Sequence, residues 1–244
     1  MASTSETGHA KNVGNFQRLI NFVTSYGAEY NPSKTMLKLP ALNALKTAAS
    51  AAMDDVVAKK QAENDRTNER SAAFAVVPKL ATRLVNALEA TDASEEKLED
   101  AKGFNRKIQG KSGSSDKKSP DAKTGEPEPD PISSSQKSFD QIIEHLSGLL
   151  AVIENEPTYA PNEDELKTAT VSALIDDLTA KNQAAETAIT NLSNARIDRN
   201  EVLYTNEDSV VETAEDVKKY VKSIYGASNP KYEQVQSIEF KKIR

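Results

Sequence analysis

The sequence predicts an all-α protein made of two duplicated, elongated helical bundles of three to four helices each, joined by a disordered linker. Three observations favour this fold class. Glycine and proline are scarce, at 9 and 10 of 244 residues, whereas β-sandwiches and barrels use many of them in turns. Apolar residues recur every three or four positions in several long stretches. No stretch shows the sustained apolar–polar alternation, bounded by turn residues, that is typical of a half-buried strand.

The first helix is expected over residues 15–26, after a flexible N-terminus of residues 1–14. Its apolar residues recur at spacings of three and four, and Gly27 can adopt the left-handed conformation that ends a helix. A second helix of the same kind is expected over residues 138–154. Its apolar stripe is cleaner, and Ser138 is a good N-cap.

Two long helices follow these first helices. One begins at Ser33 or at Pro40, which suits a first helical turn, and continues to about residue 75. The other has Asn162 as its expected N-cap, with Glu165 three residues later as in a capping box, and continues to about residue 204. Both are rich in alanine, which allows close packing of helices in a bundle.

A third helix is expected to begin at Pro78, and its counterpart to be capped by Asn206 and to end at Gly226. A fourth piece begins near Ser94 in one case and near Pro230 in the other. The sequence leaves open whether these fourth pieces are short helices or irregular tails.

Between the two sets of helices, residues 109–137 are rich in glycine, serine and lysine and then in alternating proline. This composition is typical of a disordered or extended linker. The linker divides the chain into a first repeat over residues 15–108 and a second over residues 138–244. A docking or modification role for the linker is the lesser alternative.

The two halves share short sequence matches in the same order, which indicates a tandem duplication. Tyr30-Asn31-Pro32 corresponds to Tyr159-Ala160-Pro161, and Asn68-Glu69-Arg70 corresponds to Asn194-Ala195-Arg196. The spacing between matched positions differs from one match to the next, so the exact register between the repeats stays open.

The halves differ in charge although the apolar pattern is kept. Residues 15–108 contain 14 Lys and Arg against 12 Asp and Glu, whereas residues 138–244 contain 11 against 19. One interpretation is drift on solvated surfaces. The other is that the mildly basic half meets the acidic half, within one chain or head-to-tail between chains.

The composition excludes several classes of chemistry. Cysteine is absent, which removes disulfides, zinc–thiolate sites, iron–sulfur clusters and thiol catalysis. The imidazoles are His9 and His145. The pair Glu144-His145 lacks the further ligands of a di-iron bundle, so His145 is expected at a solvent-facing or boundary position. Adjacent acidic residues point apart on a helix, so the acidic doublets of this sequence are not expected to act as paired catalytic carboxylates. We expect no enzyme activity, catalytic residue, metal or cofactor, and no small-molecule substrate.

Basic residues gather at the end of each repeat and are candidate contacts for a polyanion. They are Arg106, Lys107, Lys111, Lys241, Lys242 and Arg244. The net charge of −6 makes the chain a poor general nucleic-acid binder, so this is the second choice of function. No stretch of 18 apolar residues and no secretory signal occurs, so we expect a soluble, cytoplasmic protein without a membrane partner.

The two Tyr-x-Pro motifs, Asn194-Ala195-Arg196, the segment 217–223 and the turn Gly226-Ala227 resemble those of a group of uncharacterised all-helical bacterial proteins with two internal repeats. The resemblance implies no activity, cofactor or site. The leading expectation is therefore a non-enzymatic structural or scaffolding protein that acts through coiled-coil-like helix faces. Its partner is expected to be another protein or a second copy of the chain, in which case it self-assembles.

Overall fold

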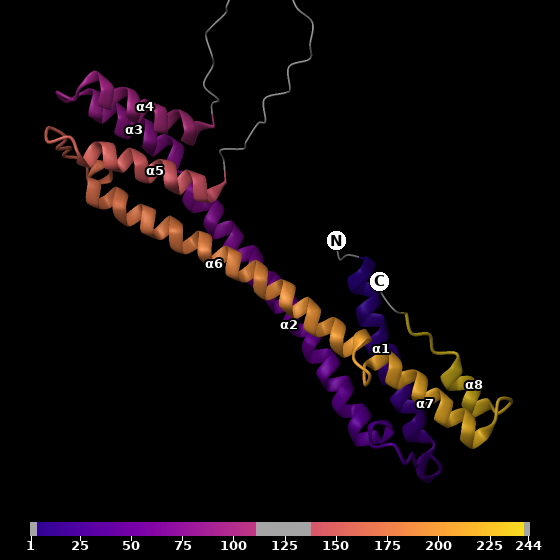
Figure 1. The fold of residues 1–244 in the computed structure, drawn as a ribbon. Helices are drawn as coiled ribbons and strands as arrows, with labels where there is room; N and C mark the ends of the chain where they lie inside the picture. Colours follow the sequence, from indigo (N-terminus) through magenta and orange to yellow (C-terminus); the bar gives the residue numbers. More distant parts are fainter. Residues whose placement is uncertain (1–3, 111–137, 242–244) are drawn as a thin grey trace, which may run out of the picture. The chain divides into compact units, whose positions relative to one another are not determined.

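The computed structural model describes residues 4–110 and 138–241, and within these ranges it contains helices and short connections but no strand (Figure 1). The prediction of an all-α fold is confirmed. Of the expected linker, Gln109 and Gly110 are described, and residues 111–137 lie outside the described ranges. Among the described residues, no helix combines the length and apolar character that crossing a bilayer requires.

The helices of the two halves follow the same order. The first half contains α1 (Thr4–Ser25), α2 (Leu39–Phe74), α3 (Val77–Glu89) and α4 (Glu95–Gln109). The second half contains α5 (Phe139–Glu154), α6 (Thr168–Asn200), α7 (Val210–Tyr225) and α8 (Pro230–Gln236). A 3₁₀ turn precedes each long helix, at Thr35–Leu37 and at Asp164–Leu166, and a π-helical turn, Glu201–Thr205, follows α6.

Several expected helix ends are confirmed by their capping geometry. The Ser138 hydroxyl accepts a hydrogen bond from the Gln141 N–H at 3.2 Å, and Ser94 caps α4 in the same way. Pro78 lies in the first turn of α3. Gly226 ends α7 with a φ of 83°, a left-handed conformation that favours glycine. Both fourth pieces are helices, which settles the alternative that the sequence left open.

The expected flexible N-terminus of residues 1–14 is wrong, because α1 already begins at Thr4. His9 and Asn12 are buried. The Asn12 side chain donates to the Lys241 carbonyl at 2.7 Å and accepts from the Lys241 N–H at 3.1 Å. The His9 Nδ1 lies 2.6 Å from the Tyr204 hydroxyl. These polar partners come from the far end of the chain, so local composition could not indicate them.

Two expected N-caps are also wrong. Asn162 does not cap α6, because the chain first makes its 3₁₀ turn and buries Leu166 before the helix begins at Thr168. Asn206 follows the π-helical turn, and Ser209 is the residue that caps α7, accepting from the Glu212 N–H at 3.4 Å. In both cases the connection uses more residues than the simplest reading of the sequence allows.

The chain forms two compact units. Unit 1 comprises Met1–Glu63 and Ala188–Arg244, and unit 2 comprises Asn64–Thr187. The core of unit 1 combines residues of α1, the start of α2, α7 and α8, including Phe16, Leu19, Leu42, Val217 and Val235. The core of unit 2 combines residues of α3, α4, α5 and the start of α6, including Leu84, Leu88, Ile108, Leu149 and Leu178.

The two units therefore do not follow the expected repeats of residues 15–108 and 138–244. In unit 1, α1 from the first half packs against α7 and α8 from the second half. In unit 2, α5 from the second half packs against α3 and α4 from the first half. We call this arrangement the exchanged pairing. The 36 residues of α2, about 54 Å long, separate α1 from α3 and α4 of the same half, so each of these helices packs on helices of the other half.

Matching contacts in the two halves support the duplication, which stays a prediction. The Tyr30 hydroxyl donates to the Leu37 carbonyl at 2.7 Å, and the Tyr159 hydroxyl donates to the Leu166 carbonyl at 2.9 Å. The starts of α2 and α6 are separated in sequence by the same distance as the two Tyr-x-Pro motifs. Buried positions of α3 and α7 also correspond in a constant register: Val77, Ala81, Leu84 and Leu88 match Val210, Ala214, Val217 and Val221.

Candidate interaction surface

The predicted polyanion contacts are divided between the two units. Arg106 and Lys107 are exposed in the last turn of α4 in unit 2. Lys241 belongs to unit 1, where Asn12 holds its backbone. The other three candidates, Lys111, Lys242 and Arg244, lie outside the described residues. The Lys107 ammonium lies 5.4 Å from the centre of the Phe104 ring, so one aromatic side chain accompanies this basic pair.

His145 is buried on α5, contrary to the expected boundary position. It lies one turn before Gly148, which packs against Phe104 of α4, and its Nε2 is buried without a hydrogen-bond partner. Burial lowers the pKa of the imidazole, and the nearby charge of Lys107 lowers it further. Within the described ranges, no group of three His, Asp or Glu side chains is placed to hold a metal ion.

We expect the replacement His145→Leu to remove a pH dependence of stability. The pKa of His145 is lower in the folded chain than its ordinary value of 6.5, so the unfolded chain binds the proton more readily. Stability is therefore lost as the pH falls through that value. Urea unfolding at pH 7.5 and 5.5 should show a smaller difference for His145→Leu than for the native chain. An unchanged difference would contradict this assignment.

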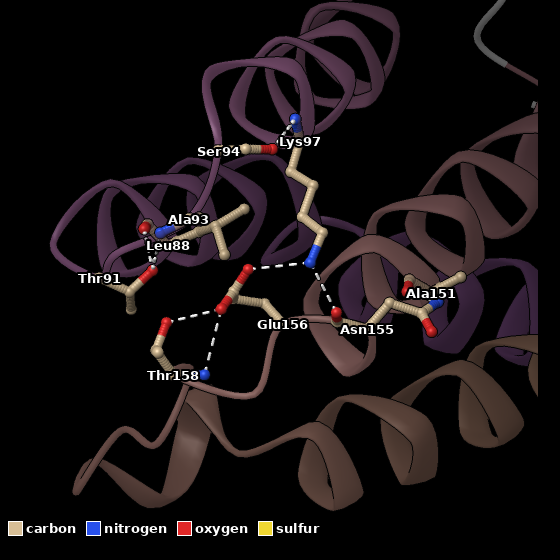
Figure 2. Close-up of polar contacts among 9 residues, drawn as sticks. All are labelled: Leu88, Thr91, Ala93, Ser94, Lys97, Ala151, Asn155, Glu156 and Thr158. Atoms are coloured by element: carbon tan, nitrogen blue, oxygen red, sulfur yellow. Dashed lines mark hydrogen bonds and ion pairs between the residues drawn. The ribbon is translucent and has the colours of Figure 1, made fainter.

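A buried carboxylate fastens the loop after α5 to the first turn of α4 within unit 2. Figure 2 shows Glu156 accepting hydrogen bonds from the Thr158 hydroxyl at 2.7 Å, the Thr158 N–H at 3.1 Å and the Lys97 ammonium at 2.9 Å. The same ammonium donates to the Asn155 carbonyl at 2.7 Å. Hydrogen bonds from Thr158 and Lys97 lower the pKa of Glu156 to about 2.

Unit 1 contains a similar fastening of the loop after α1. Glu29 accepts from the Tyr225 hydroxyl at 2.6 Å and from the Lys231 ammonium at 2.5 Å. The ammonium also lies 4.7 Å from the centre of the Tyr225 ring. In each unit, a lysine in the first turn of the fourth helix binds a carboxylate on the loop after the first helix of the other half. These groups stabilise the exchanged pairing.

The replacement Glu156→Gln is expected to flatten the acid limb of the stability curve. The folded-state pKa of about 2 is below the ordinary value of 4.5, so Glu156 stabilises the fold above pH 4.5. This contribution is lost as the pH falls from 4.5 to about 2. Thermal unfolding followed by circular dichroism across this range measures it. Glu154→Gln, two residues earlier at the end of α5, is the control and should leave the slope as it is in the native chain.

Arg70 is a third buried polar group, within unit 2. Its Nη1 donates to the Asn182 amide oxygen at 3.0 Å and to the Glu186 carboxylate at 2.8 Å. Its guanidinium carbon lies 4.3 Å from the centre of the Phe139 ring. Asn182 in turn donates to Asp140 at 2.7 Å. The network joins α2, α5 and α6 and uses its charged groups in contacts within the fold.

A surface that the sequence analysis missed lies on α2 and α6 in unit 1. Three large apolar side chains are exposed there: Val57 by 68%, Ile189 by 40% and Ile197 by 54%. Residues 188–195 of α6 contain no charged side chain. An uncharged stretch within an exposed helix is the signal that could have identified this surface from the sequence.

These side chains share one side of the helix pair. In unit 1, α2 and α6 run antiparallel, and Val56 packs with Leu192 and Ala195 between them (Figure 1). Val57 directly follows buried Val56, and Ile189 directly follows buried Ala188. In an antiparallel pair, residues one position past the buried stripe of each helix point to the same side. Ser193 and Ile197 continue the row at i+4 and i+8 on α6. Val57, Ile189, Ser193 and Ile197 form what we call the α2–α6 patch.

No protein-family model, curated protein or solved structure matches this chain.

Proposed function

We propose that the chain is a non-enzymatic structural protein that self-associates, with the α2–α6 patch of one copy packed on the same patch of a second copy. One observation carries the proposal: Ile189 and Ile197 lie four residues before and four residues after Ser193 on an exposed helix. The row is therefore symmetric about a small side chain.

This symmetry fits a two-fold contact between identical helices. If two copies of α6 cross at Ser193 about a two-fold axis, Ile189 of each copy meets Ile197 of the other. Such a contact is isologous, as in most homodimers. Rows at i±4 are also the ridges that interdigitate in the commonest class of helix packing, and a small central residue allows the helices to approach closely.

The size of the patch predicts a weak association. Full burial of an aliphatic side chain contributes about 1.5–3 kcal/mol, and association itself costs about 4–15 kcal/mol. The six side chains of a pair are only 40–68% exposed before association, so their further burial contributes a total of the same order as that cost. We expect a dimer that dissociates on dilution, which suits a protein that assembles at high local concentration.

Sedimentation velocity of the full chain over a concentration series tests the proposal. The native chain should shift from monomer towards dimer, and Ile189→Lys with Ile197→Lys should remain a monomer throughout. Val76→Lys is the matched control, because Val76 is also an exposed valine, at 53%, but belongs to unit 2. A native chain that stays monomeric, or a control that dissociates equally, would overturn the proposal. The alternative of a nucleic-acid partner stays a prediction.

A further inference from the structure

Two ion pairs join the halves in the exchanged pairing. In one the loop residue is basic and the helix residue acidic, and in the other the loop residue is acidic and the helix residue basic. In unit 1, the segment before α2 packs against α7, and the Lys34 ammonium lies 2.9 Å from the Asp216 carboxylate. In unit 2, the 3₁₀ turn before α6 packs against α3, and Arg83 forms an ion pair with Glu165. Each ion pair joins the third helix of one half to the loop before the long helix of the other half.

The charges at corresponding positions of the two halves are inverted. In the register that matches the buried positions of α3 and α7, Arg83 corresponds to Asp216 and Lys79 to Glu212. In the register that matches the starts of α2 and α6, Lys34 corresponds to Glu163. Both the third helix and the loop therefore change sign between the halves.

Neighbouring charges strengthen the difference in sign between the two ion-pair sites. The pKa of Lys34 is raised chiefly by Asp216, with smaller contributions from Asp208 and Glu207. The pKa of Asp216 is lowered by hydrogen bonds from Lys34 and Lys219. On the other side, the loop before α6 has three consecutive acidic residues, 163–165, and the α3 helix that it meets carries Lys79 and Arg83.

We propose that these charges select the exchanged pairing, so that each half of the chain binds the other half in preference to itself. The alternative pairing joins a half to the same half of a second copy, because the 36 residues of α2, about 54 Å long, hold Lys34 far from the α3 of its own half. In that pairing Lys34 would face Lys79 and Arg83 of the second copy. The acidic loop 163–165 would likewise face Glu212 and Asp216 of the second copy. Like charges would meet at both sites, whereas the exchanged pairing brings opposite charges together at both.

Charge can discriminate where apolar packing does so only weakly. In the register of the third helices, Val77 and Ala81 match Val210 and Ala214, whereas Leu84 and Leu88 match the smaller Val217 and Val221, and Val85 matches buried Lys218. Each of the apolar pairs differs by at most one methylene, a difference that a core can accommodate at moderate cost. Specificity then requires a repulsive element against the wrong pairing, and the like charges of the alternative provide it.

The test exchanges the charges of the third helices in the full chain. The exchanged-charge variant carries Lys79→Glu, Arg83→Asp, Glu212→Lys and Asp216→Arg. The compensated variant carries these four together with Lys34→Glu and Glu165→Lys. Both keep the net charge of −6, so a general charge effect is excluded.

Engineered cysteines report which pairing is present, and the absence of native cysteine makes them unambiguous. Asn15 donates to the Glu239 carbonyl at 2.7 Å, so Asn15→Cys with Glu239→Cys reports the exchanged pairing through a short thiol crosslinker. Gly103 corresponds to Glu239 in the first half, since each directly precedes a phenylalanine near the end of its repeat. Asn15→Cys with Gly103→Cys therefore reports pairing of like halves from two copies, as a covalent dimer.

With native charges we expect the 15–239 crosslink and no 15–103 crosslink. The exchanged-charge variant should shift the ratio of the two crosslinks by about tenfold towards 15–103, because each exposed pair changes an equilibrium a few-fold. The shift should shrink at high salt, which screens exposed charges. The compensated variant should restore the native ratio, even if the exchanged-charge variant loses its helical structure. An unchanged ratio in the exchanged-charge variant, or no recovery in the compensated one, would overturn the proposal.

Discussion

Cutting the chain between its two halves should leave a particle with the mass of the intact chain. A protease site inserted within residues 111–137 separates the half that contains α1 to α4 from the half that contains α5 to α8. Each compact unit combines helices of both halves around a shared core, so the fragments have two apolar interfaces that persist after the cut. Size-exclusion chromatography with light scattering gives the mass, and a denaturing gel shows the cut.

Fragments that separate into two particles under native conditions would contradict this expectation and would favour two self-contained bundles. The chain without the inserted site, treated with the same protease, is the control for cleavage elsewhere. Strong denaturant followed by dilution extends the measurement. Recovery of one particle from the two fragments would show that the halves recognise each other without a covalent connection.

Phe16→Ala should destabilise the fold by about 3–5 kcal/mol, since it removes one of the largest fully buried side chains and leaves a cavity. Phe16 lies on α1 in the core of unit 1, which α1 shares with α7 and α8. Hydrogen exchange measured by mass spectrometry should therefore accelerate in α7 and α8. It should change little in α3 and α4, although these belong to the same half of the sequence as Phe16.

Leu149→Ala is the matched replacement in the other unit. Leu149 is fully buried on α5, and its loss should cost about 2–5 kcal/mol. Exchange should then accelerate in α3 and α4, which pack against α5. If either replacement loosens the third and fourth helices of its own half, the exchanged pairing is wrong.

Local features of the fold were predictable because their causes lie within a few residues. Ser94, Ser138 and Gly226 cap or end helices through contacts with their own turn, so the sequence indicates them directly. Asn162 and Asn206 were wrongly predicted as N-caps because a 3₁₀ turn and a π-helical turn add residues before the next helix. The burial of Leu166 explains the first of these additions.

Features that depend on distant residues were not predictable. The burial of His145 depends on α4, and the order of residues 4–14 depends on Tyr204 and Lys241. The α2–α6 patch was missed because Val57, Ile189 and Ile197 fit a helical apolar pattern, and a pattern does not show which apolar residues remain exposed. The basic ends of the repeats were visible in the sequence, but not their division between units.

The exchanged pairing also determines when each part of the chain can fold during synthesis. Unit 2 is continuous in sequence from Asn64 to Thr187, so its residues are all available once Thr187 has left the ribosome. Helix α1 is made before unit 2, but its partners α7 and α8 are made after it, and the contact between Asn12 and Lys241 joins positions that are 229 residues apart. Until then the apolar face of α1 lacks the helices that bury it in the finished chain. Premature termination or slow translation after Thr187 should therefore prolong the exposure of this face and favour aggregation.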